Sequence, residues 1–215
     1  MFLYLEYFHD LGNNIYMKYD VIFAGVGGQG VLSIASVIAH AAMSQGLEVR
    51  QSEVHGMAQR GGAVLAHLRI ADKKIPGDLV PRGGADLIIS MEPLESLRYV
   101  SYLKQGGMVV TASEPFNNIT NYPDIEEVHS MIKCLPKWRI VQAASLAKES
   151  GLSKTVNTVM VGAASYFLPI KSQSLEATIS AAFAKKDPSV AIANTKAFKL
   201  GQAAVTPASG AISGT

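Results

Sequence analysis

The sequence has little cysteine, few charged residues and no apolar run long enough to cross a membrane. Its single cysteine, Cys134, excludes an intrachain disulfide, and one thiolate cannot hold an iron–sulfur cluster alone. Charged residues make up only 17% and the formal net charge is +2, so the basic footprint of a nucleic-acid-binding protein is missing. The first residues lack the basic and apolar regions of a secretory signal. We therefore expect a cytoplasmic protein without nucleic-acid or membrane partners, in which Cys134 fills space rather than attacks a substrate.

Common catalytic motifs are missing as well. The sequence contains no Gly-x-Ser-x-Gly nucleophile elbow and no Walker loop ending in Gly-Lys-Ser/Thr. Histidines, cysteines and acids do not recur at the spacing of metal ligands, so we predict that this chain binds no metal.

The 215 residues, 48% of them hydrophobic, are enough for one domain with a substantial core. Apolar runs and turn residues predict strands at 19–24, 47–51, 63–71, 86–91, 107–112 and 139–143. Helical periodicity predicts helices at 31–44, 144–150, 154–167, 173–185 and 190–204. This alternation predicts a single α/β domain over residues 17–205, a three-layer α/β/α sandwich with a Rossmann-like, mostly parallel (mixed) sheet. Residues 1–16 would be an extension outside it, and 206–215 a disordered tail.

The strand predicted at 63–71 differs from the others because apolar and polar residues alternate along it. One face carries Val64, Ala66, Leu68 and Ile70, and the other face carries His67 and Arg69. A period of two is typical of a strand with one solvated face. We expect a half-exposed edge strand, with an antiparallel direction as one option.

A glycine-rich turn, Gly25-Val26-Gly27-Gly28-Gln29-Gly30, connects the first strand to the first helix. Glycines allow a tight turn and a close approach to phosphate, and the helix N-terminus attracts anions. Gln29 has an amide that can bond a ligand or a neighbouring subunit. A dinucleotide site also needs an acid at the end of the second strand, but Glu48 begins that strand and Glu53 opens the following loop. A stand-alone nucleotide-binding protein or dehydrogenase and a turn without a ligand therefore both stay open.

The segment from Ser52 to Gly62 is the second polar loop at this predicted sheet edge. In a parallel sheet it would meet the glycine turn at the carboxyl ends of neighbouring strands. Arg60-Gly61-Gly62 places a guanidinium beside bare backbone, which suits a phosphate or a carboxylate, although a surface pair between Arg60 and Glu53 is the alternative. His55 is a hydrogen-bonding group or a proton donor.

Two polar residues further along the chain also need an explanation. Glu92 follows the strand at 86–91 and is placed to cap the next helix. Asn157 lies on an otherwise apolar helix and needs a hydrogen-bond partner if it is buried.

Taken together, Gly25–Gly30, the run His55-Gly56-Met57-Ala58-Gln59-Arg60-Gly61-Gly62 and the later run Asn194–Gly201 resemble the gamma-type subunit or domain of 2-oxoacid:ferredoxin oxidoreductases. The second run is most similar to the small, beta, subunit of indolepyruvate ferredoxin oxidoreductase. The resemblance covers about residues 17 to 205. It implies oxidative decarboxylation of a 2-oxoacid, such as an arylpyruvate, to an acyl-CoA, with electrons passed to ferredoxin.

The resemblance also implies how the work is divided between subunits. Thiamine diphosphate, Mg and 4Fe–4S clusters would sit in a large (alpha) partner subunit, and this chain would bind no cofactor alone and be inactive in isolation. It would complete the assembly and line the path by which coenzyme A approaches. Whether the isolated chain forms a homo-oligomer stays open. The residues implied in cofactor binding or subunit contact, with Glu53 added from the loop, are Gly27, Gly28, Gln29, Gly30, Glu53, His55, Gly56, Arg60, Gly61 and Gly62.

Overall fold

The computed structural model describes residues 16–55, 61–117, 119–183 and 187–206. Its strands form one six-stranded sheet in the order β2-β3-β1-β4-β5-β6. They are β1 (Lys18–Val26), β2 (Glu48–His55), β3 (Ala63–Ala71), β4 (Ala85–Ser90), β5 (Leu103–Ala112) and β6 (Trp138–Val141). Strands β1, β4, β5 and β6 pair in parallel, whereas β3 runs antiparallel to both β1 and β2. The predicted α/β domain with a mixed, mostly parallel sheet is confirmed.

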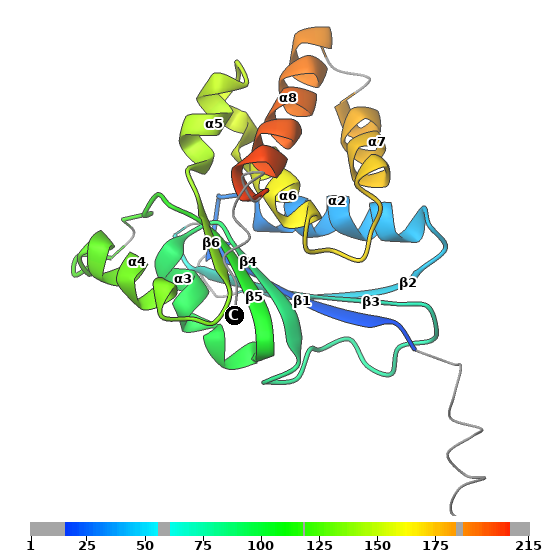
Figure 1. Ribbon diagram of the computed structural model, residues 1–215, viewed down its shortest axis with the longest axis horizontal. Helices are drawn as coiled ribbons and strands as arrows, with labels where there is room; N and C mark the ends of the chain where they lie inside the picture. The colour runs from blue at the N-terminus through cyan, green and yellow to red at the C-terminus, as the bar shows by residue number, and fades with distance from the viewer. Residues whose placement is uncertain (1–15, 56–60, 118, 184–186, 207–215) are drawn as a thin grey trace, which may run out of the picture.

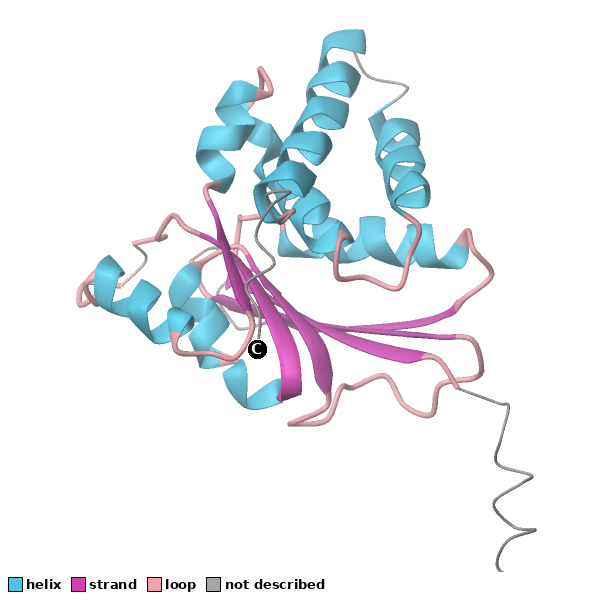
Figure 2. Ribbon diagram, viewed as in Figure 1, coloured by secondary structure: helices cyan, strands magenta, loops and turns pink. Residues whose placement is uncertain are grey.

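Helices cover both faces of the sheet, as Figures 1 and 2 show. One face carries α2 (Val31–Met43), α5 (Ala143–Glu149), α6 (Val156–Ser165), α7 (Ser172–Phe183) and α8 (Pro188–Val205). The other face carries α3 (Pro93–Arg98) and α4 (Ile125–Lys133), and the short 3-10 turns are η1 (Val100–Tyr102) and η2 (Ser153–Thr155). The predicted helix at 154–167 is therefore a 3-10 turn followed by a shorter α-helix, and α4 was not predicted.

The main core lies between the sheet and the layer of five helices. Inward residues of β1 such as Val21 and Phe23 meet Ile34 and Ile38 of α2, and all four are 0–1% exposed. A smaller cluster around Ile22, Ile88 and Val109 lies on the opposite face. The strands therefore bury apolar residues on both sides, as parallel strands covered by helices do. This burial fixes the carboxyl ends of β1, β4 and β5 along one edge of the sheet.

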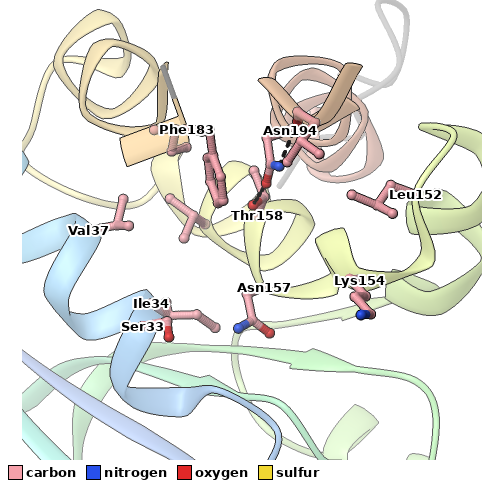
Figure 3. Close-up of a pocket in the computed structure, with 12 residues that line it drawn as sticks. Ser33, Ile34, Val37, Leu152, Lys154, Asn157, Thr158, Phe183 and Asn194 are labelled. Atoms are coloured by element: carbon pink, nitrogen blue, oxygen red, sulfur yellow. Dashed lines mark hydrogen bonds between the residues drawn. The ribbon is translucent and has the colours of Figure 1, made fainter. Parts of the chain in front are cut away.

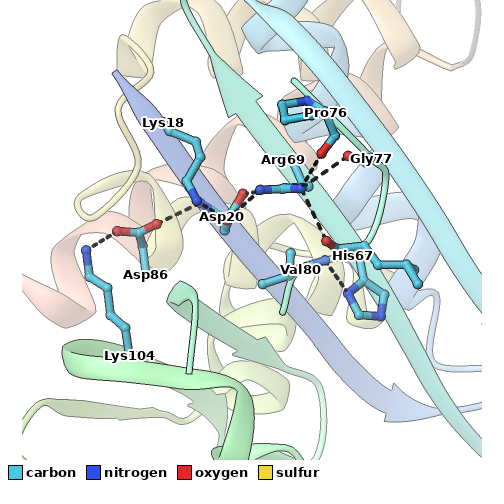
Figure 4. Close-up of polar contacts among 10 residues, drawn as sticks. Lys18, Asp20, His67, Arg69, Pro76, Gly77, Val80, Asp86 and Lys104 are labelled. Atoms are coloured by element: carbon cyan, nitrogen blue, oxygen red, sulfur yellow. Dashed lines mark hydrogen bonds and ion pairs between the residues drawn. The ribbon is translucent and has the colours of Figure 1, made fainter. Parts of the chain in front are cut away.

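Strand β3 is not an edge strand, and its polar face is not exposed. It lies between β1 and β2, and Arg69 and His67 are only 7% and 3% exposed. The Arg69 guanidinium donates to both Asp20 oxygens at 2.9 and 3.3 Å and to the backbone carbonyls of Pro76, Gly77 and Leu79. Figure 4 shows this arrangement. The connection between β3 and β4 therefore folds back over the polar face, which corrects the expectation of a half-exposed edge.

The same network continues to β4, as Figure 4 also shows. Asp20 pairs with Lys18 at 2.9 Å, and its backbone N–H donates to Asp86 at 2.7 Å. Asp86 in turn pairs with Lys104. The wholly buried Asp20 carboxylate thus has charged partners on two strands, which a buried charge requires.

Two smaller expectations are also wrong. The second strand runs to His55 rather than ending at residue 51, so Glu53 and His55 belong to β2 and not to a loop. Cys134 is exposed after the end of α4, so it does not fill space in the core.

Candidate functional site

The glycine turn and the second motif meet directly at the carboxyl edge of the sheet. The Gly27 N–H donates to the Gly62 carbonyl at 2.8 Å, and the Gly61 N–H donates to the Gly27 carbonyl at 3.3 Å. Gly61 has a φ of 77°, a left-handed conformation that favours glycine. The residues that directly precede β3 make this contact, because β3, and not β2, lies next to β1 in the sheet. The two motifs are therefore adjacent, although their strands are not neighbours as we had expected.

The Gln29 side chain stabilises the glycine turn through hydrogen bonds to backbone groups. Its side-chain Oε1 accepts the Val26 N–H at 2.7 Å, and its Nε2 donates to the Met91 carbonyl at 3.2 Å. The Gln29 backbone N–H also donates to the Val26 carbonyl at 3.0 Å. The amide thus ties the end of β1 to the end of β4. A contact of Gln29 with a ligand or a subunit stays a prediction.

A second contact that fixes the turn is made between Gly30 and Asn157. Gly30 has a φ of 75°, and a Cβ built there would lie 2.1 Å from Asn157 Nδ2. Asn157 Nδ2 donates to the Gly30 carbonyl at 3.3 Å. The partner that the sequence required for Asn157 is therefore the carbonyl that precedes α2. No spacing rule could have identified this pair, because the two residues are 127 positions apart.

Only part of the turn offers free backbone donors. The N–H groups of Gly27 and Gln29 are bonded within the chain, which corrects the expectation that all four from Gly27 to Gly30 are free. In the described part of the chain, the N–H groups of Gly28 and Gly30 have no protein acceptor, and Gly28 is exposed. The helix that follows has no side-chain cap at Gly30. Its N-terminus therefore attracts anions at this point.

A cavity of about 470 Å³ opens beside these donors. Gly28, Gln29 and Gly30 form one wall, and the others come from the ends of β4 and β5 and from the starts of α5 and α6. Its remaining lining residues are Met91, Ala112, Glu114, Pro115, Phe116, Ala144, Ser153, Lys154, Val156 and Asn157. Lys154 is exposed and has no acidic partner within the described residues, whereas Glu114 accepts the Ala144 N–H at 3.0 Å. The cavity therefore combines backbone donors with one unpaired cation, which suits an anionic ligand.

Glu92 does more than cap a helix. It accepts the Glu95 N–H at 2.8 Å, which confirms the predicted cap of α3, and its other oxygen accepts the Phe116 N–H at 3.4 Å and the Tyr122 hydroxyl. Glu92 is only 1% exposed. Burial, and next the hydrogen bond to Glu92, raise the pKa of Tyr122. Glu92 thus holds the segment after β5, which supplies Glu114, Pro115 and Phe116 to the cavity.

Part of the second motif lies outside the described residues. Gly56 and Arg60 fall there, and so does the alternative pair of Arg60 with Glu53. Backbone pairing places His55 opposite Val64, and Glu53 is exposed on β2, where its Oε1 accepts from the Gln51 amide at 3.0 Å. Strand β2 is two strands from β1, a separation of about 10 Å, so Glu53 is poorly placed for a ribose bound at the glycine turn. This position weighs against the stand-alone dehydrogenase.

The later run Asn194–Gly201 forms a packing surface of α8. Asn194 Oδ1 accepts the Thr158 hydroxyl at 2.6 Å, and the next turns bring Phe198 and Gly201 against α6. Within the described residues, no group of three or more histidines, cysteines and acids is arranged to hold a metal ion. The helices of the same residues include none that is both long and apolar enough to span a bilayer.

Comparison with known proteins matches this architecture to one family. The family model described as pyruvate ferredoxin/flavodoxin oxidoreductase matches residues 20–204. The chain is 38% identical over 194 residues to the indolepyruvate oxidoreductase subunit IorB of Pyrococcus horikoshii, covering 86% of this chain and 94% of the relative. It is 31% identical over 170 residues to the pyruvate/ketoisovalerate oxidoreductases common subunit gamma of Thermococcus litoralis, covering 76% and 86%.

Solved structures share the fold. The gamma subunit of a keto/oxoacid ferredoxin oxidoreductase from Geobacter sulfurreducens superposes with a TM-score of 0.63 and 23% identity, covering 87% of this chain and 98% of that one. The 2-oxoglutarate:ferredoxin oxidoreductase of Magnetococcus marinus, solved with 2-oxoglutarate, coenzyme A and succinyl-CoA bound, gives a TM-score of 0.70 at 23% identity. This chain covers 31% of that longer chain, and the match spans 87% of this one. The family model and the relatives confirm the resemblance seen in the motifs, and the chain belongs to the pyruvate ferredoxin/flavodoxin oxidoreductase family.

Proposed function

We propose that this chain is the small accessory subunit of a cytoplasmic 2-oxoacid:ferredoxin oxidoreductase that acts on indolepyruvate or a related arylpyruvate. The relative from Pyrococcus horikoshii, similar over nearly its whole length, supports the arylpyruvate class. The complete reaction decarboxylates the 2-oxoacid oxidatively, forms an acyl-CoA and passes electrons to ferredoxin. A large partner subunit would carry thiamine diphosphate, Mg and the 4Fe–4S clusters, as the family resemblance implies, and the single cysteine of this chain, which cannot hold a cluster alone, is consistent with that division.

The contribution of this chain is an anion-binding wall for coenzyme A. The observation that carries this proposal is the pair of bonds between Gly27 and Gly61–Gly62, which holds the second motif against the glycine turn, and Gly28, Gln29 and Gly30 of that turn form one wall of the cavity. Free N–H groups of Gly28 and Gly30, the N-terminus of α2 and the Lys154 ammonium suit a phosphate group. The Magnetococcus marinus structure, which contains coenzyme A, supports this class of ligand. The chain orients the coenzyme, and the partner supplies the redox chemistry.

Reconstitution tests this function. The large subunit expressed alone, this chain alone and the two together are assayed for dye reduction with indolepyruvate and coenzyme A. We expect turnover only from the pair, and we expect the isolated chain to be colourless. Turnover by the isolated chain, or its saturable binding of a nicotinamide cofactor, would instead support the stand-alone dehydrogenase.

A further inference from the structure

A second cavity lies within the helical layer, away from the sheet edge. It has a volume of about 550 Å³ and is lined by residues of α2, α6, α7 and α8, by Leu152 before η2 and by Lys154 within η2. Its walls are mainly apolar, and Figure 3 shows Ile34, Val37 and Phe183 around the opening between the helices. Protein interiors are close-packed, with few voids larger than a water molecule. A cavity of this size falls in the range of small-molecule sites, which are largely apolar with a few polar groups.

This cavity is separate from the one at the glycine turn. Asn157 and Lys154 line both cavities, and the bond of Asn157 to the Gly30 carbonyl joins α6 to the start of α2 between them. Ser33 and Ile34, on the far side of that bond, face only the helical cavity. A molecule in the helical cavity therefore lies away from the backbone donors of the glycine turn, although Lys154 borders both cavities.

Five of the twelve residues that line the cavity are polar, namely Ser33, Lys154, Asn157, Thr158 and Asn194. Thr158 and Asn194 bond to each other at 2.6 Å, and Asn194 Nδ2 donates to the Val190 carbonyl at 2.8 Å. The two side chains are 7% and 2% exposed, and together they give the wall a neutral polar patch. The one charged lining residue is Lys154, which is exposed and has no acidic partner within the described residues.

We propose that the helical cavity binds a small monocarboxylate with an apolar body. The carboxylate pairs with the Lys154 ammonium at the rim, and the body lies between Ile34, Val37, Val161 and Phe183. One cation with no acidic lining residue matches a single negative charge, whereas a phosphate dianion normally draws several donors. Burial of the body against aliphatic and aromatic walls supplies the favourable free energy, because apolar surface leaves water. This site is additional to the proposed function, and the two ligands would share the Lys154 ammonium.

The experiment uses the full chain with labelled isoleucine and valine methyl groups. 4-Phenylbutyrate is the probe, and 4-phenylbutyramide, of the same shape but uncharged, is the matched compound. We expect saturable shifts of the methyl signals of Ile34 and Val161 with the acid, and at least tenfold weaker binding of the amide. Lys154→Ala should weaken binding of the acid at least tenfold and leave the amide unchanged. Lys148→Ala, which removes an exposed lysine of α5 outside the cavity, should change neither.

Val37→Phe fills the cavity and should abolish the shifts of Ile34, with circular dichroism as the check that the variant folds. If that variant does not fold, two comparisons still test the proposal. They are the affinity of the acid against that of the amide, and the loss of affinity in Lys154→Ala against that in Lys148→Ala. Absence of saturable methyl shifts would overturn the proposal. Equal binding of acid and amide, or equal loss in the two lysine variants, would overturn it as well.

Discussion

Gly201 of α8 packs directly against the backbone of Val159 in α6. A Cβ built on Gly201 would lie 2.0 Å from the Val159 carbonyl oxygen, and one built on Gly162 would lie 2.1 Å from the Phe198 carbonyl oxygen. Both obstacles are backbone atoms, so they cannot rotate away as a side chain can. The two helices thus approach each other through a reciprocal pair of glycines, and this contact holds the helical layer over the sheet.

Gly201→Ala should destabilise the fold although alanine favours a helix by about 1 kcal/mol. The added methyl group forces α6 and α8 apart, and such overpacking costs about 1–3 kcal/mol. After the gain in helix propensity is subtracted, the net loss is about 0–2 kcal/mol, so for a chain of this size we expect a fall in Tm of up to roughly 8 °C, measured by calorimetry. Ala203→Gly, on the exposed face of the same helix, is the control and should show only the smaller propensity effect. A Gly201→Ala variant with a raised Tm would show that the helices are not in this contact.

Acidification should destabilise the protein through His67. Its Nδ1 accepts the Val80 N–H at 3.2 Å, so the bonded form is neutral at that nitrogen. Burial, and next the charge of Arg69, lower the pKa of His67 below its ordinary value of 6.5. The unfolded chain therefore binds a proton first, and stability is lost as the pH falls through about 6.5, by at most about 1.4 kcal/mol per pH unit.

Urea unfolding at pH 7.5 and 5.5 measures this effect. His67→Asn keeps an acceptor for the Val80 N–H but cannot titrate, so its loss of stability over the same range should be smaller. Equal losses in the wild type and in His67→Asn would assign the pH dependence to other groups.

The segment after β5 should loosen when its bond to Glu92 is removed. Tyr122→Phe removes the phenolic donor to a carboxylate that is buried, and a lost hydrogen bond to a charged group costs about 1.5–3 kcal/mol. We expect faster hydrogen exchange over residues 113–122, the segment that forms one wall of the glycine-turn cavity. Tyr166→Phe, at a tyrosine that is 59% exposed, is the matched control. Unchanged exchange in Tyr122→Phe would show that Glu92 only caps α3.

The sequence was sufficient for most of the elements, with α4 missed, and for the adjacency of the two motifs, because apolar periodicity and glycine positions are local signals. It was not sufficient for the burial of Arg69, since alternation alone cannot reveal that the carbonyls of Pro76, Gly77 and Leu79 return over that face. The internal role of Gln29 was missed for a similar reason. Its acceptor, the Met91 carbonyl, is 62 residues away, directly after β4, and the pairing of β4 with β1 could not be deduced from spacing.

Arg60 provides the test of the glycine-turn cavity as a coenzyme A site. It directly precedes Gly61 in the sequence, and the Gly61 N–H donates to the Gly27 carbonyl of the glycine turn. If its guanidinium binds a phosphate of coenzyme A or a partner carboxylate, Arg60→Ala removes a charged hydrogen bond worth about 1.5–3 kcal/mol. The reconstituted enzyme should then lose roughly ten- to a hundredfold in apparent coenzyme A affinity or in subunit association.

The substitution series separates this role from a surface pair. Arg60→Lys should restore only part of the loss, because an ammonium cannot make the bidentate contact of a guanidinium. Arg82→Ala removes an exposed arginine from the β3–β4 connection, at the opposite end of β4 from the cavity, and should leave coenzyme A dependence unchanged. A surface pair of Arg60 with Glu53 would contribute at most about 1 kcal/mol to stability and nothing to the assay. If Arg60→Ala and Arg82→Ala both leave the coenzyme A KM and the assembly unchanged, Arg60 is a surface residue, and the anion contact must rest on Lys154 and the backbone donors alone.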